Sequence, residues 1–196
     1  MTIAVEALTG SALQAVLPDL ARLRIAGFRD WPYLYDGTLE YEQKYLARFA
    51  AAPDTIIVIA REGASIIGAS TASPMTGHVD EFASAFRAHG IDPTSVYYFG
   101  ESVLLPAYRG LGIGHSFFGH REARARFLDR FRHLAFCSVV RPADHPRRPT
   151  DHRPLDVFWR GRGYEPVQGL VATLTWKDID QTAATPKPMQ FWMRGL

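Results

Sequence analysis

Cysteine is nearly absent from this chain: Cys137 is the only one among 196 residues. A single cysteine excludes an internal disulfide and any zinc site built from several cysteines. The seven histidines show no His-Glu-x-x-His pattern and no other spacing typical of metal ligands. The sequence therefore predicts no metal site, and we expect the histidines other than His115 on the surface or in loops.

An excess of charge of one sign is missing as well. The chain has 22 lysines and arginines against 20 aspartates and glutamates, a net charge of +2. So balanced a chain has no strong field to attract nucleic acid or a membrane surface. The arginines of 121–132 and 147–162 are interleaved with acidic residues, which is typical of a solvated face. We therefore expect neither nucleic acid nor a membrane as a partner.

The sequence also lacks long apolar runs. The stretch 55–60 is far too short to cross a membrane, and residues 1–6 lack the basic start of a secretory signal. These absences predict a cytoplasmic location. Hydrophobic residues make up 47% of the chain and aromatic residues 12%, which is enough for a sizeable core. A chain of this length predicts a single domain over 1–196.

Apolar periodicity predicts a protein of the α/β (α+β) class. Helical spacing covers 11–27, a stretch after the possible N-cap Thr38, 79–89, 112–132 and 155–161. Strand-like patterns cover 3–7, 55–61, 65–72, 95–105, 134–140, 167–176 and 189–193. The helix over 79–89 is interpreted as an insertion. Without it the element order is β-αα-βββ-α-β-α-ββ.

The most informative motif follows the strand predicted over 95–105. Pro106 ends the apolar run, and three glycines at alternate positions, Gly110, Gly112 and Gly114, precede a long helical pattern. Glycines let the backbone approach a ligand closely, and a helix start offers unpaired N–H groups and a positive dipole end. Arg109 adds a positive charge. The sequence therefore predicts an anion site here, with a glycine-rich turn that binds nothing as the alternative.

Two common phosphate-binding motifs do not match. No Gly-Lys-Ser/Thr follows the glycines, and in a Gly-x-Gly-x-x-Gly pattern the last position falls on His115 or Phe117. What remains is Arg109-x-x-Gly112-x-Gly114. It resembles the Arg/Gln-x-x-Gly-x-Gly/Ala pyrophosphate loop of the GNAT superfamily, the acyl-CoA-dependent N-acyltransferases, whose element order also matches almost the whole chain. The resemblance implies a mixed, mostly antiparallel twisted sheet, split open in a V, with helices on both faces.

The resemblance also implies which residues hold acetyl-CoA, the acyl donor. Its pantetheine would pair with the backbone of Ser102, Val103 and Leu104, and those N–H groups would polarise the thioester carbonyl. Its pyrophosphate would lie on Arg109, Gly110, Leu111, Gly112, Ile113, Gly114 and His115.

Two positions depart from the family pattern. His152 stands where many members have an asparagine that bonds the cofactor, and Trp159 stands in a second motif where tyrosine is usual. The usual tyrosine protonates the leaving thiolate, which an indole cannot do. Another tyrosine or solvent must then supply the proton.

Glu101 is the candidate general base, because many GNAT enzymes place a carboxylate at this point of the strand. A carboxylate on a solvated face, or one paired with an arginine, is the alternative. Tyr98, with Tyr97, is expected to hold a water that relays the proton. Cys137 lies in an apolar strand and is interpreted as an inert core residue rather than a nucleophile.

The acceptor side is expected in the aromatic segment 30–37. Tyr33, Tyr35 and Asp36 offer ring faces and a carboxylate, which suit a cationic amine or an aromatic substrate. The alternative is that these rings only bury the loop, and Trp31 fits that alternative. Glu40 and Glu42 are interpreted as solvated helix charges.

The sequence thus predicts an N-acetyltransferase that moves an acetyl group to a primary amine of a small molecule by direct attack in a ternary complex. A protein or peptide amine is an alternative, although the insertion 76–92 and the loop 142–154 are expected to cover the cleft. A non-catalytic acyl-CoA-binding or sensing module is another, supported by Trp159. The aromatic strand 189–193, expected near an edge of the sheet, favours a homodimer.

Overall fold

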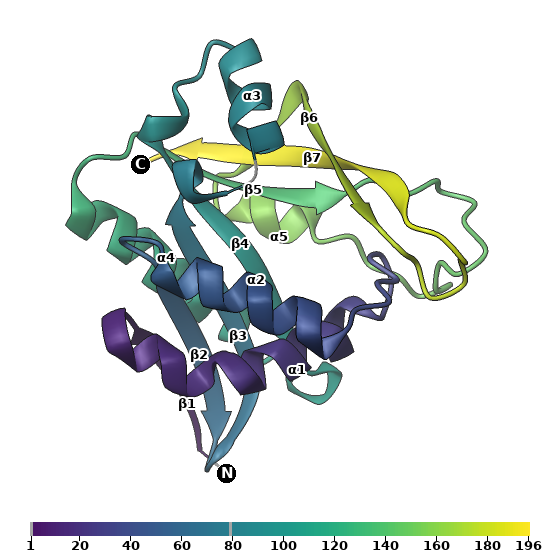
Figure 1. Ribbon diagram of the computed structural model, residues 1–196, viewed down its shortest axis with the longest axis horizontal. Helices are drawn as coiled ribbons and strands as arrows, with labels where there is room; N and C mark the ends of the chain where they lie inside the picture. Colours follow the sequence, from purple (N-terminus) through teal and green to yellow (C-terminus); the bar gives the residue numbers. More distant parts are fainter. Residues whose placement is uncertain (1, 79) are drawn as a thin grey trace.

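The computed structural model describes residues 2–78 and 80–196, in which one sheet carries seven strands in the order β1-β2-β3-β4-β5-β7-β6 (Figure 1). Neighbouring strands are antiparallel except for β4 and β5. The expected mixed, mostly antiparallel sheet is therefore confirmed. The strands are β1 (Ile3–Leu8), β2 (Ile56–Glu62), β3 (Ser65–Pro74), β4 (Val96–Leu104), β5 (His133–Val139), β6 (Glu165–Trp176) and β7 (Thr185–Gly195).

The helices lie on both faces of the sheet, as expected: α1 and α2 cover one face, and α4 and α5 lie behind it (Figure 1). They are α1 (Leu17–Phe28), α2 (Leu39–Ala51), α3 (Asp80–Ala88), α4 (Ile113–Leu128) and α5 (Asp156–Gly161). Val79, the first residue of the expected inserted helix, lies outside the described residues. The described part of the chain also contains the short 3₁₀ helices η1 (Gly10–Val16), η2 (Met75–Gly77), η3 (Pro93–Ser95) and η4 (Pro106–Tyr108).

Strand β2 shows why this sequence forms a sheet between two helical layers. Successive side chains of a strand point to opposite faces. Ile57 and Ile59 accordingly join the core beneath α1 and α2, whereas Val58 joins the core beneath α4. A strand covered on both faces is apolar at every position rather than at alternate ones, which is the pattern of 55–61.

Two helix boundaries differ from expectation. The first predicted helix divides into η1 and α1, because Pro18 lies in the first turn of α1, where its fixed φ and missing N–H favour a helix start. The main helix α4 ends at Leu128 rather than at 132. Asp129 adopts a left-handed φ of 47° and its N–H bonds to the Arg126 carbonyl, which closes the helix.

The expectation of a last strand near an edge is wrong. β7 is longer than 189–193 and lies between β5, which it pairs from His133↔Gly195 to Val139↔Met189, and β6. Before Met189 the strand pairs with β6 and no longer with β5, so prolines at 186 and 188 are tolerated there and β7 begins at Thr185. The edge strands are β1 and β6, so β7 is not free to pair with another chain.

The sheet opens in the middle, as the V-shaped split requires. β4 and β5 pair over three residues only, from Val96↔His133 to Tyr98↔Ala135. After Tyr98 the two strands separate, and within residues 2–78 and 80–196 no strand pairs with the backbone of β4 from Phe99 to Leu104 on that side. This free edge is followed by η4 and then by the glycine-rich loop before α4.

Candidate active site

A β-bulge in β4 sets the geometry of the opening. Ser102 pairs with Ser70 and Phe99 with Ala72, so Gly100 and Glu101 together face Thr71. Glycine is required at 100, because a Cβ there would lie 2.6 Å from Thr71 Oγ1. The extra residue shifts the alternation of side chains: Phe99 packs beneath α4, whereas Val103 packs beneath α1 and α2.

Glu101 is buried at this bulge and forms an ion pair. Its Oε2 lies 2.7 Å from Arg24 Nη1 of α1, and Arg24 Nε lies 2.5 Å from Glu42 Oε2 of α2. The Arg24 guanidinium lies 4.5 Å from the Tyr45 ring centroid and 5.1 Å from that of Phe28. Glu101 is thus paired with an arginine through Oε2, whereas among the described residues its Oε1 has no hydrogen-bond partner.

Glu42 corrects an expectation. The sequence suggests a solvated helix charge, but the residue is fully buried and paired with Arg24. The cluster thus holds two carboxylates around one arginine. The two carboxylates attract Arg24 strongly enough to raise its pKa, although burial alone would lower it.

Tyr98 and Cys137 meet where β4 and β5 part. The Tyr98 hydroxyl lies 3.0 Å from Cys137 Sγ. Burial raises the pKa of the Cys137 thiol to about 12, which disfavours the nucleophilic thiolate and supports an inert role. Tyr97 does not join Tyr98 as a relay, because its hydroxyl donates to the Asp54 carbonyl.

His78 lies in the loop after η2, as the sequence suggests for a surface or loop residue, but it is half-buried and contacts the sheet. Its Nε2 lies 2.8 Å from Ser73 Oγ, and its ring centroid lies 4.6 Å from that of Tyr98. Burial lowers the pKa of His78 to about 4, so the ring is neutral at pH 7. No spacing or motif in the sequence signals this contact with β4.

The segment 30–37 brings two of its three predicted residues to the Glu101 cluster. Tyr33 packs against Phe28, with ring centroids 4.7 Å apart, and its pKa is raised by burial and then by Cys137 and Glu101. The pKa of Tyr35 is raised by burial and by Glu42. Asp36 does not join them: it pairs with Lys177 at 2.6 Å and with Arg29, and these cations lower its pKa.

Arg141, which follows β5, fastens this segment to the rest of the molecule. Its guanidinium donates to the carbonyls of Pro32 and Tyr33 at 2.8 and 2.7 Å, and to both carboxylate oxygens of Asp178 at 2.7 and 2.9 Å. Trp176 Nε1 also donates to the Tyr33 carbonyl. The segment is therefore held against the β6–β7 hairpin rather than free.

The glycine-rich loop has the geometry of an anion cradle. Gly110 and Gly112 have φ of 81° and 80°, in the region that favours glycine, and α4 begins at Ile113. A Cβ at either glycine would meet no atom within 4 Å, so the space in front of the loop is open. Among the described residues the N–H groups of Ile113 and Gly114 have no backbone partner, whereas the His115 N–H donates to the Gly112 carbonyl at 3.0 Å. Backbone N–H groups and the helix dipole here fit a pyrophosphate.

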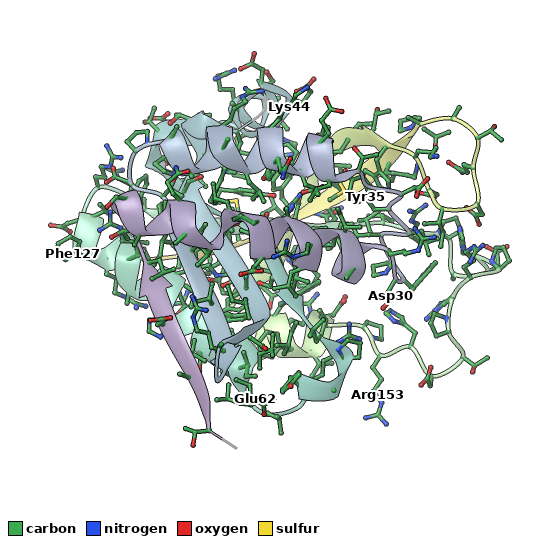
Figure 2. The ribbon with its side chains drawn as sticks, turned by 60° about the horizontal axis from the view of Figure 1, so that its bottom comes forward. Asp30, Tyr35, Lys44, Glu62, Phe127 and Arg153 are labelled. Carbon is green, nitrogen blue, oxygen red and sulfur yellow. The ribbon has the colours of Figure 1, made fainter. Side chains whose placement is uncertain are left out.

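Of three further residues predicted to bind the cofactor, His115 lies next to this loop, and His152 and Trp159 make contacts elsewhere. His115 follows it directly, with Nδ1 3.2 Å from Arg162 Nη1 and its ring 4.9 Å from that of Phe158. His152 packs edge-on against Trp31, so it contacts the segment 30–37; Figure 2 shows Asp30 and Arg153 on this same side of the molecule. Trp159 is half-buried and packs against Phe136 and Trp192 at the margin of the apolar core.

Within residues 2–78 and 80–196, no three histidine, cysteine, aspartate or glutamate side chains gather closely enough to hold a metal ion. In the same part of the chain, no helix combines the length and the apolar character needed to cross a membrane.

Sequence comparison gives no match to a protein-family model and none to a curated protein. Solved structures do match over nearly their whole length. A ribosomal-protein-alanine N-acetyltransferase from Brucella melitensis is 15% identical, with a TM-score of 0.61 over 98% of this chain and 99% of that one. A GCN5-related N-acetyltransferase from Kribbella flavida is 14% identical, with a TM-score of 0.57 over 99% and 98%.

A third structure contains the expected donor. A Salmonella typhimurium protein assigned as an acetyltransferase, and solved with acetyl-CoA, is 10% identical, with a TM-score of 0.59 over 100% of this chain and 95% of that one. At such identities the likeness concerns the fold. The chain has the fold of the GNAT acetyltransferases.

Proposed function

We propose that this protein is an N-acetyltransferase that moves an acetyl group from acetyl-CoA to a primary amine of a small molecule, by direct attack in a ternary complex. The observation that carries the proposal is the free edge of β4. It opens at Tyr98, bears the buried Glu101 at its bulge and ends in the glycine cradle before α4.

The donor fits this edge through backbone groups. The Leu105 N–H donates to Ile67 of β3 and the Glu101 N–H to Thr71, so these odd positions face β3. By alternation the N–H groups of Ser102 and Leu104 face the opening. Pantetheine amides pair with such an edge as an added strand does, and the pyrophosphate takes the loop from Arg109 to His115.

The chemistry needs few side chains. The amine nitrogen attacks the thioester carbonyl carbon, the C–N bond forms, the C–S bond breaks, and the products are an amide and the thiol of CoA. Glu101 Oε1, which has no partner among the described residues, takes the amine proton. Solvent protonates the thiolate, because the Trp159 indole donates no proton near neutral pH.

The acceptor side favours a small cationic amine with an apolar body. Tyr33 and Tyr35 present rings next to a cluster that holds two carboxylates and one arginine. Arg141 fixes the segment that bears these rings, and His152 of the following loop packs on Trp31. These contacts hold the segment and the loop together on the acceptor side, which supports a small acceptor.

A cytoplasmic location and a homodimer remain predictions. The dimer no longer has the support of β7, so a contact between sheet edges would use β1 or β6.

Release of CoA tests the proposal. The purified protein is mixed with acetyl-CoA and, separately, tryptamine, phenethylamine, spermidine or an amine-terminal peptide, and free thiol is followed with time. We expect thiol release with a small amine and a product heavier by one acetyl group. Release with the peptide alone would favour a protein amine as acceptor. Binding of acetyl-CoA without release on any amine would favour the non-catalytic module.

A further inference from the structure

Arg121 of α4 is a buried cation that touches the β4 bulge from behind. It is 1% exposed, and its Nη1 donates to the carbonyl oxygens of Glu101 and Thr71 at 3.3 and 3.4 Å. Its guanidinium carbon lies 4.3 Å from the Phe99 ring centroid and 4.7 Å from that of Phe118. The side chain therefore points at the one irregular point of the strand that borders the opening.

No carboxylate balances this charge at short range. Among the described residues no acidic oxygen lies within 4.0 Å of the Arg121 guanidinium, and Nη2 is buried without a hydrogen-bond partner. Burial lowers the pKa of Arg121 to about 10, which still leaves it charged at neutral pH. A buried cation is costly unless other groups stabilise it. Here the carbonyl oxygens of Glu101 and Thr71, the Phe117 carbonyl that Nε meets at 3.1 Å within α4, and the aromatic faces do so.

The Glu101 carbonyl and the Ser102 N–H belong to the same peptide group and point in opposite directions. The carbonyl faces Arg121 and β3, so the N–H faces the opening between β4 and β5. A cation at the carbonyl end draws electrons from the nitrogen, because hydrogen bonds in a chain polarise one another. The Ser102 N–H is then a stronger donor than an ordinary strand amide.

We propose that Arg121 is a positioning residue that polarises the Glu101–Ser102 peptide and so strengthens the Ser102 N–H as the donor to the thioester carbonyl oxygen of acetyl-CoA. This inference rests on the proposed function. It assigns a role to α4 beyond its N-terminus, since the helix then acts on both the pyrophosphate and the reacting carbonyl.

The infrared stretch of a carbonyl reports its hydrogen bonding directly. Acetyl-CoA carrying ¹³C at the acetyl carbonyl is bound to the wild-type protein, to Arg121→Met and to Arg124→Met. The last is a matched control, an arginine of the same helix that pairs with Asp54. We expect the stretching frequency of the acetyl carbonyl to fall when acetyl-CoA binds to the wild type and to Arg124→Met. In Arg121→Met the frequency should fall clearly less. With an amine that the wild type acetylates, kcat should drop about tenfold in Arg121→Met, with little change in the KM for acetyl-CoA.

The outcomes separate the two proposals. An equal fall of the carbonyl stretching frequency in the wild type and in Arg121→Met overturns the role of Arg121. The proposed acetyltransferase function is not affected by that result. No binding of acetyl-CoA to the folded wild type overturns the proposed function. Should Arg121→Met not fold, Arg121→Gln takes its place, because glutamine keeps an N–H donor and removes the charge.

A measurement without substitution covers the remaining case. In the ¹³C NMR spectrum of the wild type, the carbonyl carbon of Glu101 should resonate downfield of its random-coil shift. Carbonyl carbons in strands ordinarily resonate upfield of that shift. An upfield resonance would overturn the inference.

Discussion

At the scale of single residues, Glu101 combines two features that a catalytic carboxylate in an apolar setting needs. Arg24 fixes one oxygen at 2.7 Å, and the other oxygen has no partner among the described residues. Fixing the position of a base while leaving one oxygen free suits proton transfer from a bound amine.

We expect Glu101→Gln to lower kcat about a hundredfold while the affinity for acetyl-CoA stays unchanged, because glutamine keeps the shape but cannot accept the proton. Thiol release measures the rate and calorimetry the affinity. Glu40→Gln, an exposed carboxylate that pairs with Lys44, is the control. An unchanged rate across pH in Glu101→Gln would rule out the role of base.

His78 makes stability depend on pH in a defined direction. In the folded protein burial lowers the pKa of His78 to about 4, whereas the ordinary value is 6.5. Between pH 4 and pH 6.5 His78 therefore binds a proton in the unfolded chain but not in the folded protein. This contribution to stability is complete above pH 6.5 and is lost as the pH falls to 4, by about 3 kcal/mol.

Unfolding in urea at a series of pH values measures this loss. In His78→Gln the free energy of unfolding should decline less between pH 6.5 and pH 4 than in the wild type. His89 is exposed, so His89→Gln should show the same decline as the wild type. Equal slopes in wild type and His78→Gln would show that His78 titrates normally.

At the scale of elements, the segment 30–37 owes its position to a contact from another part of the chain. Arg141 and Asp178 are both buried, with side chains 7% and 1% exposed, and together they fasten the segment to the β6–β7 hairpin. Lys187 Nζ adds a weaker contact to Asp178 at 3.4 Å.

Arg141→Met should lower the free energy of unfolding by about 3 kcal/mol, because Asp178 loses its main partner in a buried site. It should also raise the KM for the amine about tenfold, since Tyr33 is no longer fixed, and leave the affinity for acetyl-CoA unchanged. Arg147→Met, which removes an exposed pair with Asp180, is the matched control. Equal effects of the two variants on the amine KM would contradict the role of Arg141.

Helix starts could be predicted from the sequence where the residues that determine them are neighbours in the chain. Thr38 caps α2 as expected, and the glycine-rich turn precedes α4 as the sequence predicts. The residues that sequence reasoning missed, Arg24, Glu42, Arg121 and Arg141, are buried charges. Their partners lie 18 or more positions away or on another element, apart from the Arg121 bond within α4. No periodicity distinguishes such a charge from a solvated one.

At the scale of the whole molecule, the order of the elements was predictable and the order of strands in the sheet was not. The chain order follows from local patterns, but the insertion of β7 between β5 and β6 depends on contacts between distant segments. Because β7 lies between β5 and β6, the edge strands of the sheet are β1 and β6, whereas the sequence suggests β7.

A homodimer held by a sheet edge should therefore respond to substitutions on β1 or β6. Val171→Lys on β6 or Ala7→Lys on β1 should convert the dimer to a monomer, because lysine on an edge strand opposes pairing. Light scattering gives the mass of each variant. A monomeric wild type would contradict the homodimer, and a dimer that resists both substitutions would place its contact on another surface.

The most direct test of the whole account is calorimetric titration with acetyl-CoA of the wild type, Gly112→Trp and Gly119→Ala. Gly119 lies within α4, where a Cβ meets nothing within 4 Å. We predict that the wild type and Gly119→Ala bind acetyl-CoA and that Gly112→Trp, folded by circular dichroism, does not, because the indole fills the open space before the cradle. A folded wild type that does not bind acetyl-CoA would contradict the account, leaving a GNAT fold without its donor.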